Sequence, residues 1–110
     1  MRGTKLATIG AMAVAAIALA APAQADYDTD FKNTVNGFGV YGAQDYVAWL
    51  GKISCNRMGN GVDPDAYKAA DFVQKNLPRG TSQAQAFQFI GAEINFYCPQ
   101  QAPVLQRAGH

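Results

Sequence analysis

An amphipathic stretch that ends in a cysteine, Ser82 to Cys98, constrains the fold of this chain more than any other feature. Apolar residues recur in it every three or four positions, which is the period of one helix face. Cys98 continues this stripe four residues after Ile94, and Pro99 follows at once and predicts the end of the helix. Cys55 is the only other cysteine of the sequence, so it is the partner expected for Cys98 in a disulfide bond.

The sequence also predicts where this helix begins. Ser82 can cap it, and Gln85 three residues later completes a capping box, with Thr81 as the alternative cap. The apolar face is too wide for a helix exposed to water, so we predict a core helix. That face contains Ala86, Phe87, Phe89, Ile90, Ile94, Phe96 and Tyr97.

Residues 1–25 have the pattern of a secretory signal peptide. Arg2 and Lys5 precede an apolar run over residues 6–21, and Ala23-Gln24-Ala25 is a small-x-small cleavage site. We therefore expect cleavage after Ala25 and release into the cell envelope or the medium. The alternative is a retained membrane anchor, but Pro22 and the alanine-rich composition favour cleavage.

Cleavage there leaves a single helical domain, residues 26–110, with seven basic and eight acidic side chains. This balance gives no basic face for nucleic acid, and we expect no stable membrane insertion after cleavage. A domain of 85 residues has a small core, and a Cys55–Cys98 bond would add roughly 4 kcal/mol of stability by the chain-entropy estimate. Two thiols and the terminal His110 are too few ligands for a metal site, so none is predicted.

The first segment of that domain, residues 26–38, is predicted to be a short helix with Phe31 and Val35 on one face. Aspartates at positions 26, 28 and 30 imitate the opening of a calcium loop. However, Phe31 stands where that loop needs glycine, and Gly37 stands where it needs glutamate. We therefore interpret the three acids as residues that favour a helix start.

Residues 37–42, Gly-Phe-Gly-Val-Tyr-Gly, match the dinucleotide-binding pattern G-x-G-x-x-G. That pattern has meaning only after a strand in a βαβ unit, and here the preceding residues are predicted to be helical. A loop between two helices is the better interpretation.

A second helix is expected over residues 43–58. Gly51 weakens it and indicates a close helix crossing. Ser54 has no histidine nearby in the sequence to activate it as a nucleophile. Tyr46, Leu50 and Ile53 form the predicted inward stripe, flanked by Val47, Trp49 and Cys55.

A third helix is expected to start with Asp63 as N-cap and Pro64 as first helical residue, and to run to about Leu77. Its predicted inward residues are Tyr67, Ala70 and Val73. The tail from about residue 100 has little periodicity and is expected to be mobile. With no convincing strand, the sequence predicts an all-α, compact four-helix domain with one disulfide.

The order of these features resembles the small secreted mycobacterial proteins of a domain-of-unknown-function family, the seven-three-two DUF family. The resemblance rests on the Gly-rich loop, Cys55 within a helix, the restart at residues 61–63, the segment 83–87 and the ending Tyr97-Cys98-Pro99. It implies an exported helical domain with a Cys55–Cys98 disulfide and no established activity. Trp49 departs from the pattern, because a smaller apolar residue is expected there.

Two classes of function fit these residues. The one we favour is a non-enzymatic binding protein in which surplus aromatic side chains partly line a groove for a protein partner or an apolar ligand. Haem carriage is a narrower form, because tyrosine can ligate iron, and plain aromatic packing is the simpler alternative. The aromatic residues concerned are Tyr41, Tyr46, Trp49, Tyr67, Phe96 and Tyr97.

The second class is an enzyme, such as a hydrolase of envelope material. The single histidine is His110 and the single glutamate is Glu93, so no pair of base and nucleophile is recognisable. Glu93 is expected to be a partly buried, hydrogen-bonded structural acid. The sequence thus predicts no catalytic residue and no cofactor.

Overall fold

A computed structural model of the chain describes residues 26–107. The predicted signal peptide with its cleavage site, residues 1–25, and the terminal His110 lie outside the described residues. Within residues 26–107 no helix is long and apolar enough to cross a membrane.

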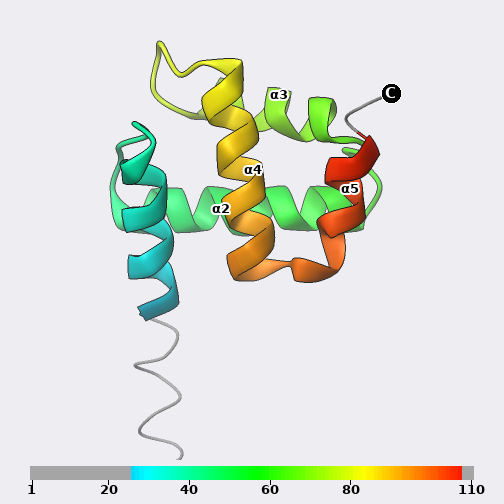
Figure 1. Ribbon diagram of the computed structural model, residues 1–110, viewed down its shortest axis with the longest axis horizontal. Coiled ribbons are helices and arrows are strands. Elements are labelled where there is room, and N and C mark those ends of the chain that lie inside the picture. Colours follow the sequence, from blue (N-terminus) through cyan, green and yellow to red (C-terminus); the bar gives the residue numbers. More distant parts are fainter. Residues whose placement is uncertain (1–25, 108–110) are drawn as a thin grey trace, which may run out of the picture.

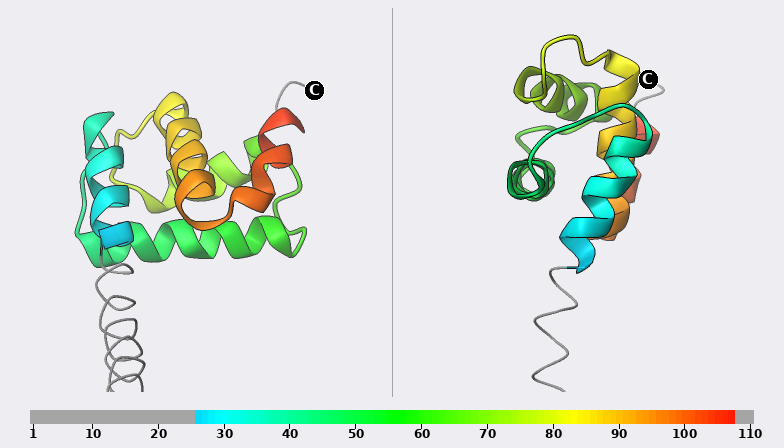
Figure 2. Two further views of the ribbon diagram at one scale, coloured as in Figure 1. Left: turned by 60° about the horizontal axis from the view of Figure 1, so that its bottom comes forward. Right: turned by 90° about the vertical axis from the view of Figure 1, so that its left-hand side faces the viewer.

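The described residues are helical and contain no strand, which confirms the predicted all-α class. The helices form two layers that cross each other (Figures 1 and 2). One layer holds α2 and α3, and the other holds the first helix, α4 and α5. The elements are the helix over residues 26–37, α2 (Gln44–Gly59), α3 (Ala66–Asn76), α4 (Gln83–Tyr97), the 3-10 turn η1 (Pro99–Gln101) and α5 (Ala102–Gln106).

Helix α4 begins where the sequence predicted. The Ser82 hydroxyl accepts from the Gln85 backbone N–H at 3.0 Å, and the Gln85 side-chain oxygen accepts from the Ser82 backbone N–H at 2.8 Å. Both arms of the capping box are therefore present. Thr81, the alternative cap, instead donates its hydroxyl to the Pro78 carbonyl at 2.7 Å.

The predicted start of α3 is wrong by two residues. Asp65, not Asp63, is the N-cap, and its carboxylate accepts from the Lys68 backbone N–H at 2.9 Å. Asp63 is instead buried and bound by the Arg57 guanidinium, with an Nε to Oδ2 distance of 2.7 Å. Asp63, which was predicted to cap α3, thus forms an ion pair with Arg57 of α2 instead.

The predicted inward face of α2 is right at Leu50, which is buried, but wrong at Tyr46 and Ile53. Tyr46 and Trp49 are exposed and Ile53 is only partly buried. The physical reason is that Cys55 must face α4 to reach Cys98, and this fixes the rotation of the helix. The buried residues accordingly are Val47, Ala48, Leu50, Gly51, Ser54, Cys55 and Met58.

In α3 the predicted Ala70 and Val73 are buried, but Tyr67 is exposed. Its ring packs edge-on against Phe87 of α4 at 5.2 Å between centroids, on the outside of the two helices. Tyrosine tolerates such a place because its hydroxyl remains hydrated.

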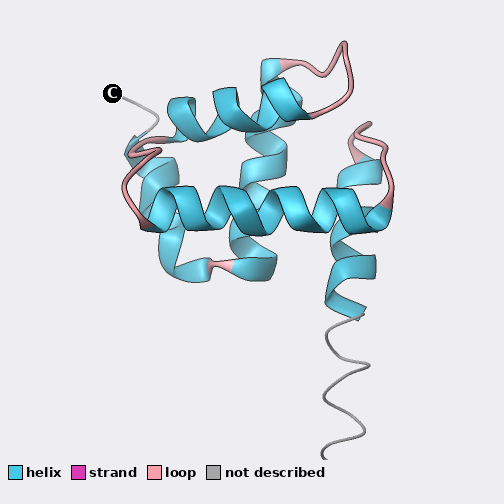
Figure 3. Cartoon of the chain, turned by 180° about the vertical axis from the view of Figure 1, so that it is seen from behind, coloured by secondary structure: helices cyan, strands magenta, loops and turns pink. Residues whose placement is uncertain are grey.

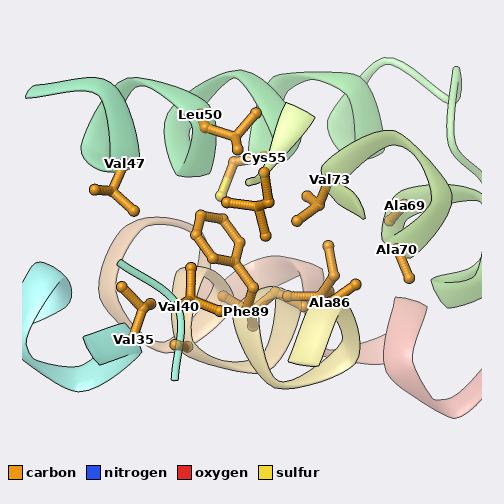
Figure 4. Packing of buried hydrophobic residues seen from close by; sticks show 14 of the residues in the cluster. Val35, Val40, Val47, Leu50, Cys55, Ala69, Ala70, Val73, Ala86 and Phe89 are labelled. Carbon is orange, nitrogen blue, oxygen red and sulfur yellow. The ribbon is translucent and has the colours of Figure 1, made fainter. Parts of the chain in front are cut away.

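The core is built around Phe89 of α4, which is fully buried (Figure 4). Phe31 from the first helix meets Phe89 edge-on, with ring centroids 5.2 Å apart. Gly51 lets the rings of Phe31 and Tyr97 pack closely against α2, because a Cβ at position 51 would lie 3.2 Å from the Phe31 ring and 3.3 Å from the Tyr97 ring. The close helix crossing predicted at Gly51 is therefore present.

Cys55 and Cys98 are bonded and tie α2 to the end of α4, across the two layers. Beyond this bond, residues 99–106 are helical, although the sequence had led us to expect a mobile tail from about residue 100. The side chain of Val104 is buried in the core, so α5 is part of the packed domain.

Loop 38–43 and the loop between α3 and α4 come together at one end of the molecule (Figure 3). The Gln85 side chain donates to the Phe38 carbonyl at 3.1 Å and joins the glycine-rich loop to the start of α4. The G-x-G-x-x-G match is thus a loop between two helices, as the sequence analysis interpreted it.

Candidate functional site

A pocket of about 440 Å³ opens over the disulfide bond. Three parts of the chain build it: the second half of α2, the end of α4 and η1, which lie side by side (Figure 2). The bond places Cys55 and Cys98 on its lining, so the pocket depends on the linkage between α2 and α4. It is lined by Lys52, Cys55, Asn56, Gly59, Asn60, Tyr97, Cys98, Gln100 and Gln101.

The polar groups of this pocket are mostly primary amides. Asn56 and Asn60 come from α2 and its C-cap, and Gln100 and Gln101 come from η1. Each amide carries two donors and an acceptor oxygen, so each can bind a hydroxyl in either direction. This cluster was not predicted, because its members come from two separate segments that form no motif. The i, i+4 asparagine spacing and the glutamine pair shortly after Cys98 are the only sequence signals for it.

One wall of the pocket is held by Asp28 of the first helix. The Tyr97 hydroxyl donates to Asp28 Oδ1 at 2.7 Å, and Lys52 Nζ lies 3.3 Å from the same oxygen. Burial and the Asp28 carboxylate both raise the pKa of Tyr97. Lys52 Nζ also lies 5.3 Å from the centre of the Tyr97 ring. Asp28, predicted as a helix-start acid, thus fixes both side chains.

A second candidate surface lies at the other end of α2. Trp49 is 50% exposed and Tyr46 is 43% exposed, and their rings are in contact with centroids 5.7 Å apart. The Tyr46 hydroxyl donates to the Asn76 carbonyl at the end of α3, at 2.6 Å. Tyr41 is 65% exposed and lines a pocket of about 280 Å³ against the α3–α4 loop.

The six aromatic residues predicted to line a groove are not gathered around one. Tyr97 lines the pocket over the disulfide and Tyr41 lines the loop pocket. Phe96 and Tyr97 pack against Phe31, at 5.8 and 5.0 Å between ring centroids. Tyr67 lies against Phe87, while Tyr46 and Trp49 contact each other in the solvent. Trp49, the departure from the family pattern, therefore does not alter the packing around Cys55.

Glu93 is fully buried, more deeply than predicted, and neither carboxylate oxygen has a hydrogen-bond partner within the described residues. The hydroxyl of Ser54, also fully buried, likewise lacks a partner there. Desolvation raises the pKa of Glu93 well above its ordinary value, and the nearby Ser54 hydroxyl lowers it by less. Glu93 is thus a buried carboxyl group whose protonated form the core favours, and it lacks the hydrogen-bond partner expected of a structural acid.

The structure brings Ser54 and Glu93 together, although sequence analysis considered them separately. Both are shielded from solvent, so a substrate cannot reach either side chain. Among residues 26–107 no group of three His, Cys, Asp or Glu side chains is arranged to hold a metal ion. The geometry therefore offers binding surfaces rather than a recognisable set of reacting groups.

Comparison with known proteins gives a family and close relatives. The sequence profile of the family described as "Protein of unknown function (DUF732)" matches residues 25–100. Two uncharacterized proteins of Mycobacterium tuberculosis, from strains CDC 1551 and H37Rv, are each 66% identical over 110 residues, which cover 99% of this chain and 98% of the relative. No solved structure matches the chain.

Proposed function

Starting from the fact that this chain belongs to the DUF732 family, we propose that it is an exported, non-enzymatic binding protein of the cell envelope or medium. Its exposed Tyr46–Trp49 pair is the surface that contacts a protein partner. The profile match confirms the family resemblance drawn from the sequence. Export is supported by the signal-peptide pattern of residues 1–25 and by the disulfide, which is typical of oxidising compartments.

The observation that carries the binding proposal is the exposure of a fixed aromatic pair. Tryptophan and tyrosine are enriched among the residues that dominate protein interfaces, because they offer a large area at low conformational cost. Here the cost is reduced further, since the contact between the rings and the bond from Tyr46 to Asn76 already restrict the side chains.

Haem carriage and hydrolysis have weaker support. Tyr97 is engaged with Asp28, which leaves its hydroxyl less available for iron. Glu93 and Ser54 are shielded from solvent. A Soret shift on mixing the protein with haem would favour carriage of an apolar ligand over the protein-partner proposal.

Site-specific photo-cross-linking in the native host tests the proposal. A photoreactive phenylalanine analogue is placed at position 49, and in a matched strain at position 88, because Gln88 is exposed on a different helix, α4. We expect position 49 to give a discrete adduct that contains one partner protein, identified by mass spectrometry, and position 88 to give none.

Affinity for the captured partner supplies the second measurement. Replacing a central aromatic of an interface typically costs 2 kcal/mol or more, so Trp49→Ala should weaken binding at least about 30-fold. Tyr67→Ala, at an exposed aromatic elsewhere, should leave the affinity unchanged. Identical adducts from positions 49 and 88, or equal losses in both variants, would contradict the proposal.

A further inference from the structure

We propose that the pocket over the Cys55–Cys98 disulfide binds a neutral, polyhydroxylated ligand, that is, a sugar unit of a saccharide. This site shares no residue with the Tyr46–Trp49 surface. Its volume of about 440 Å³ lies within the range of roughly 300–1,000 Å³ that is usual for small-molecule sites.

The hydrogen-bonding groups of the pocket match adjacent hydroxyls. Each hydroxyl of a sugar donates one hydrogen and accepts others, and a primary amide meets a neighbouring pair of hydroxyls with its N–H and its oxygen together. Four such amides face one opening, two on α2 and its cap and two on η1. None of these four side chains has a hydrogen-bond partner within residues 26–107, so their capacity is available to a ligand.

The charges at the pocket favour a neutral ligand. The lining residues include no carboxylate, and their single charged group is the Lys52 ammonium. That ammonium lies 3.3 Å from Asp28 Oδ1 and over the Tyr97 ring, so its charge is already balanced. A phosphate or carboxylate ligand would therefore find no unpaired cation, whereas a neutral polyol needs none.

The backbone that carries the amides is held in place before a ligand arrives. The disulfide fixes the start of η1, where the Gln101 backbone N–H donates to the Cys98 carbonyl at 2.8 Å. Across the pocket, the Asn60 backbone N–H donates to the Asn56 carbonyl at 2.9 Å. The Gln101 amide lies beside Gly59 of α2, where a Cβ would make an ordinary contact with Gln101 Nε2 at 3.4 Å. A fixed backbone lowers part of the entropic cost of binding.

Titration of ¹⁵N-labelled, oxidised protein with neutral saccharides tests the assignment. The probes are the saccharides maltose, galactose and arabinose together with the cyclic polyol myo-inositol, and the readout is the side-chain NH₂ resonances of asparagine and glutamine. We expect at least one probe to shift the signals of Asn56, Asn60 and Gln101 in a saturable way, while the signal of the exposed Gln88 stays fixed.

Variants and competing ligands make the test specific. Asn60→Ala and Gln101→Ala should each weaken binding about five-fold, as expected for the loss of one hydrogen bond of about 1 kcal/mol, and Gln88→Ala should not. Reduction of the disulfide should abolish the shifts. Triglycine and inorganic phosphate should give none. The assignment is overturned if no saccharide shifts the pocket amides up to its solubility limit, or if triglycine or phosphate shifts them instead.

Discussion

Two aromatic pairs in this domain have similar geometry and opposite surroundings. Phe31 and Phe89 meet at 5.2 Å between ring centroids in the centre of the core, and both are fully buried. Tyr46 and Trp49 meet at 5.7 Å on the surface and are about half exposed. The ring contact alone is worth only about 0.5–1.5 kcal/mol, so the difference between the pairs lies in the apolar area that each removes from water.

The polarity of each ring matches its degree of burial. Phenylalanine has no polar atom and loses nothing in a dry core, whereas tyrosine and tryptophan keep a polar group that needs a partner or water. An exposed aromatic pair that contributes little to stability is available for binding. The buried pair has no such freedom, because its faces are already covered by α2, α4 and the first helix.

The largest expected effect comes from deleting one ring of the buried pair. Phe89→Ala should lower the free energy of unfolding by about 3–5 kcal/mol, because it removes a buried ring and leaves a cavity. Trp49→Ala should lower it by less than about 1 kcal/mol, since the side chain is half exposed. Urea unfolding followed by circular dichroism measures both losses. Losses of equal size would contradict the conclusion that the buried ring stabilises the fold more than the exposed ring.

Next in size is the disulfide, which ties the end of α4 and thus Tyr97 to α2. Replacing both Cys55 and Cys98 by serine should cost about 2–5 kcal/mol. Thermal melts with and without reductant give an independent measure. If the melts superimpose and thiol titration of the unfolded, unreduced protein finds two free sulfhydryls, the bond is absent. The proposed pocket would then lack the covalent link between α2 and α4 that lines it.

The smallest expected effect, counted per pH unit, concerns Glu93, the acidic side chain within the buried region. Its pKa is raised in the folded protein above the ordinary value of 4.5, so the unfolded chain releases this proton first as the pH rises. Protonated Glu93 therefore makes its full contribution to the free energy of unfolding at pH values below 4.5. Above pH 4.5 this contribution declines by up to about 1.4 kcal/mol per pH unit, until the pH reaches the pKa of Glu93 in the folded protein.

Glu93→Gln removes this titration and should flatten the profile at pH values above the ordinary pKa of 4.5, measured as urea midpoints. Asp71→Asn, which alters an exposed pair with Lys75, serves as the control and should keep the wild-type slope. A slope unchanged by Glu93→Gln would mean that Glu93 is already ionised in the folded protein.

Features coded by neighbouring residues were predictable from the sequence. The capping box of Ser82 and Gln85 needs only a three-residue spacing, and Pro99 stops α4 wherever the helix lies. The Cys55–Cys98 pairing follows because the sequence holds two cysteines. The start of α3 was missed because Asp63 has two possible partners, and the one that binds it, Arg57, belongs to α2.

The sequence by itself thus determined the helical class, the ends of α4, the loop over residues 38–43 and the cysteine pair, because capping, periodicity and chain breaks act over a few residues. Only the tertiary structure decided that Trp49 faces water, that Glu93 lies in the core, that Val104 packs α5 into the domain, and that amides from α2 and η1 share a pocket. These outcomes depend on how each helix is rotated against its neighbours. That rotation is fixed by the disulfide and by the packing of Phe31 and Phe89, which join residues far apart in the chain.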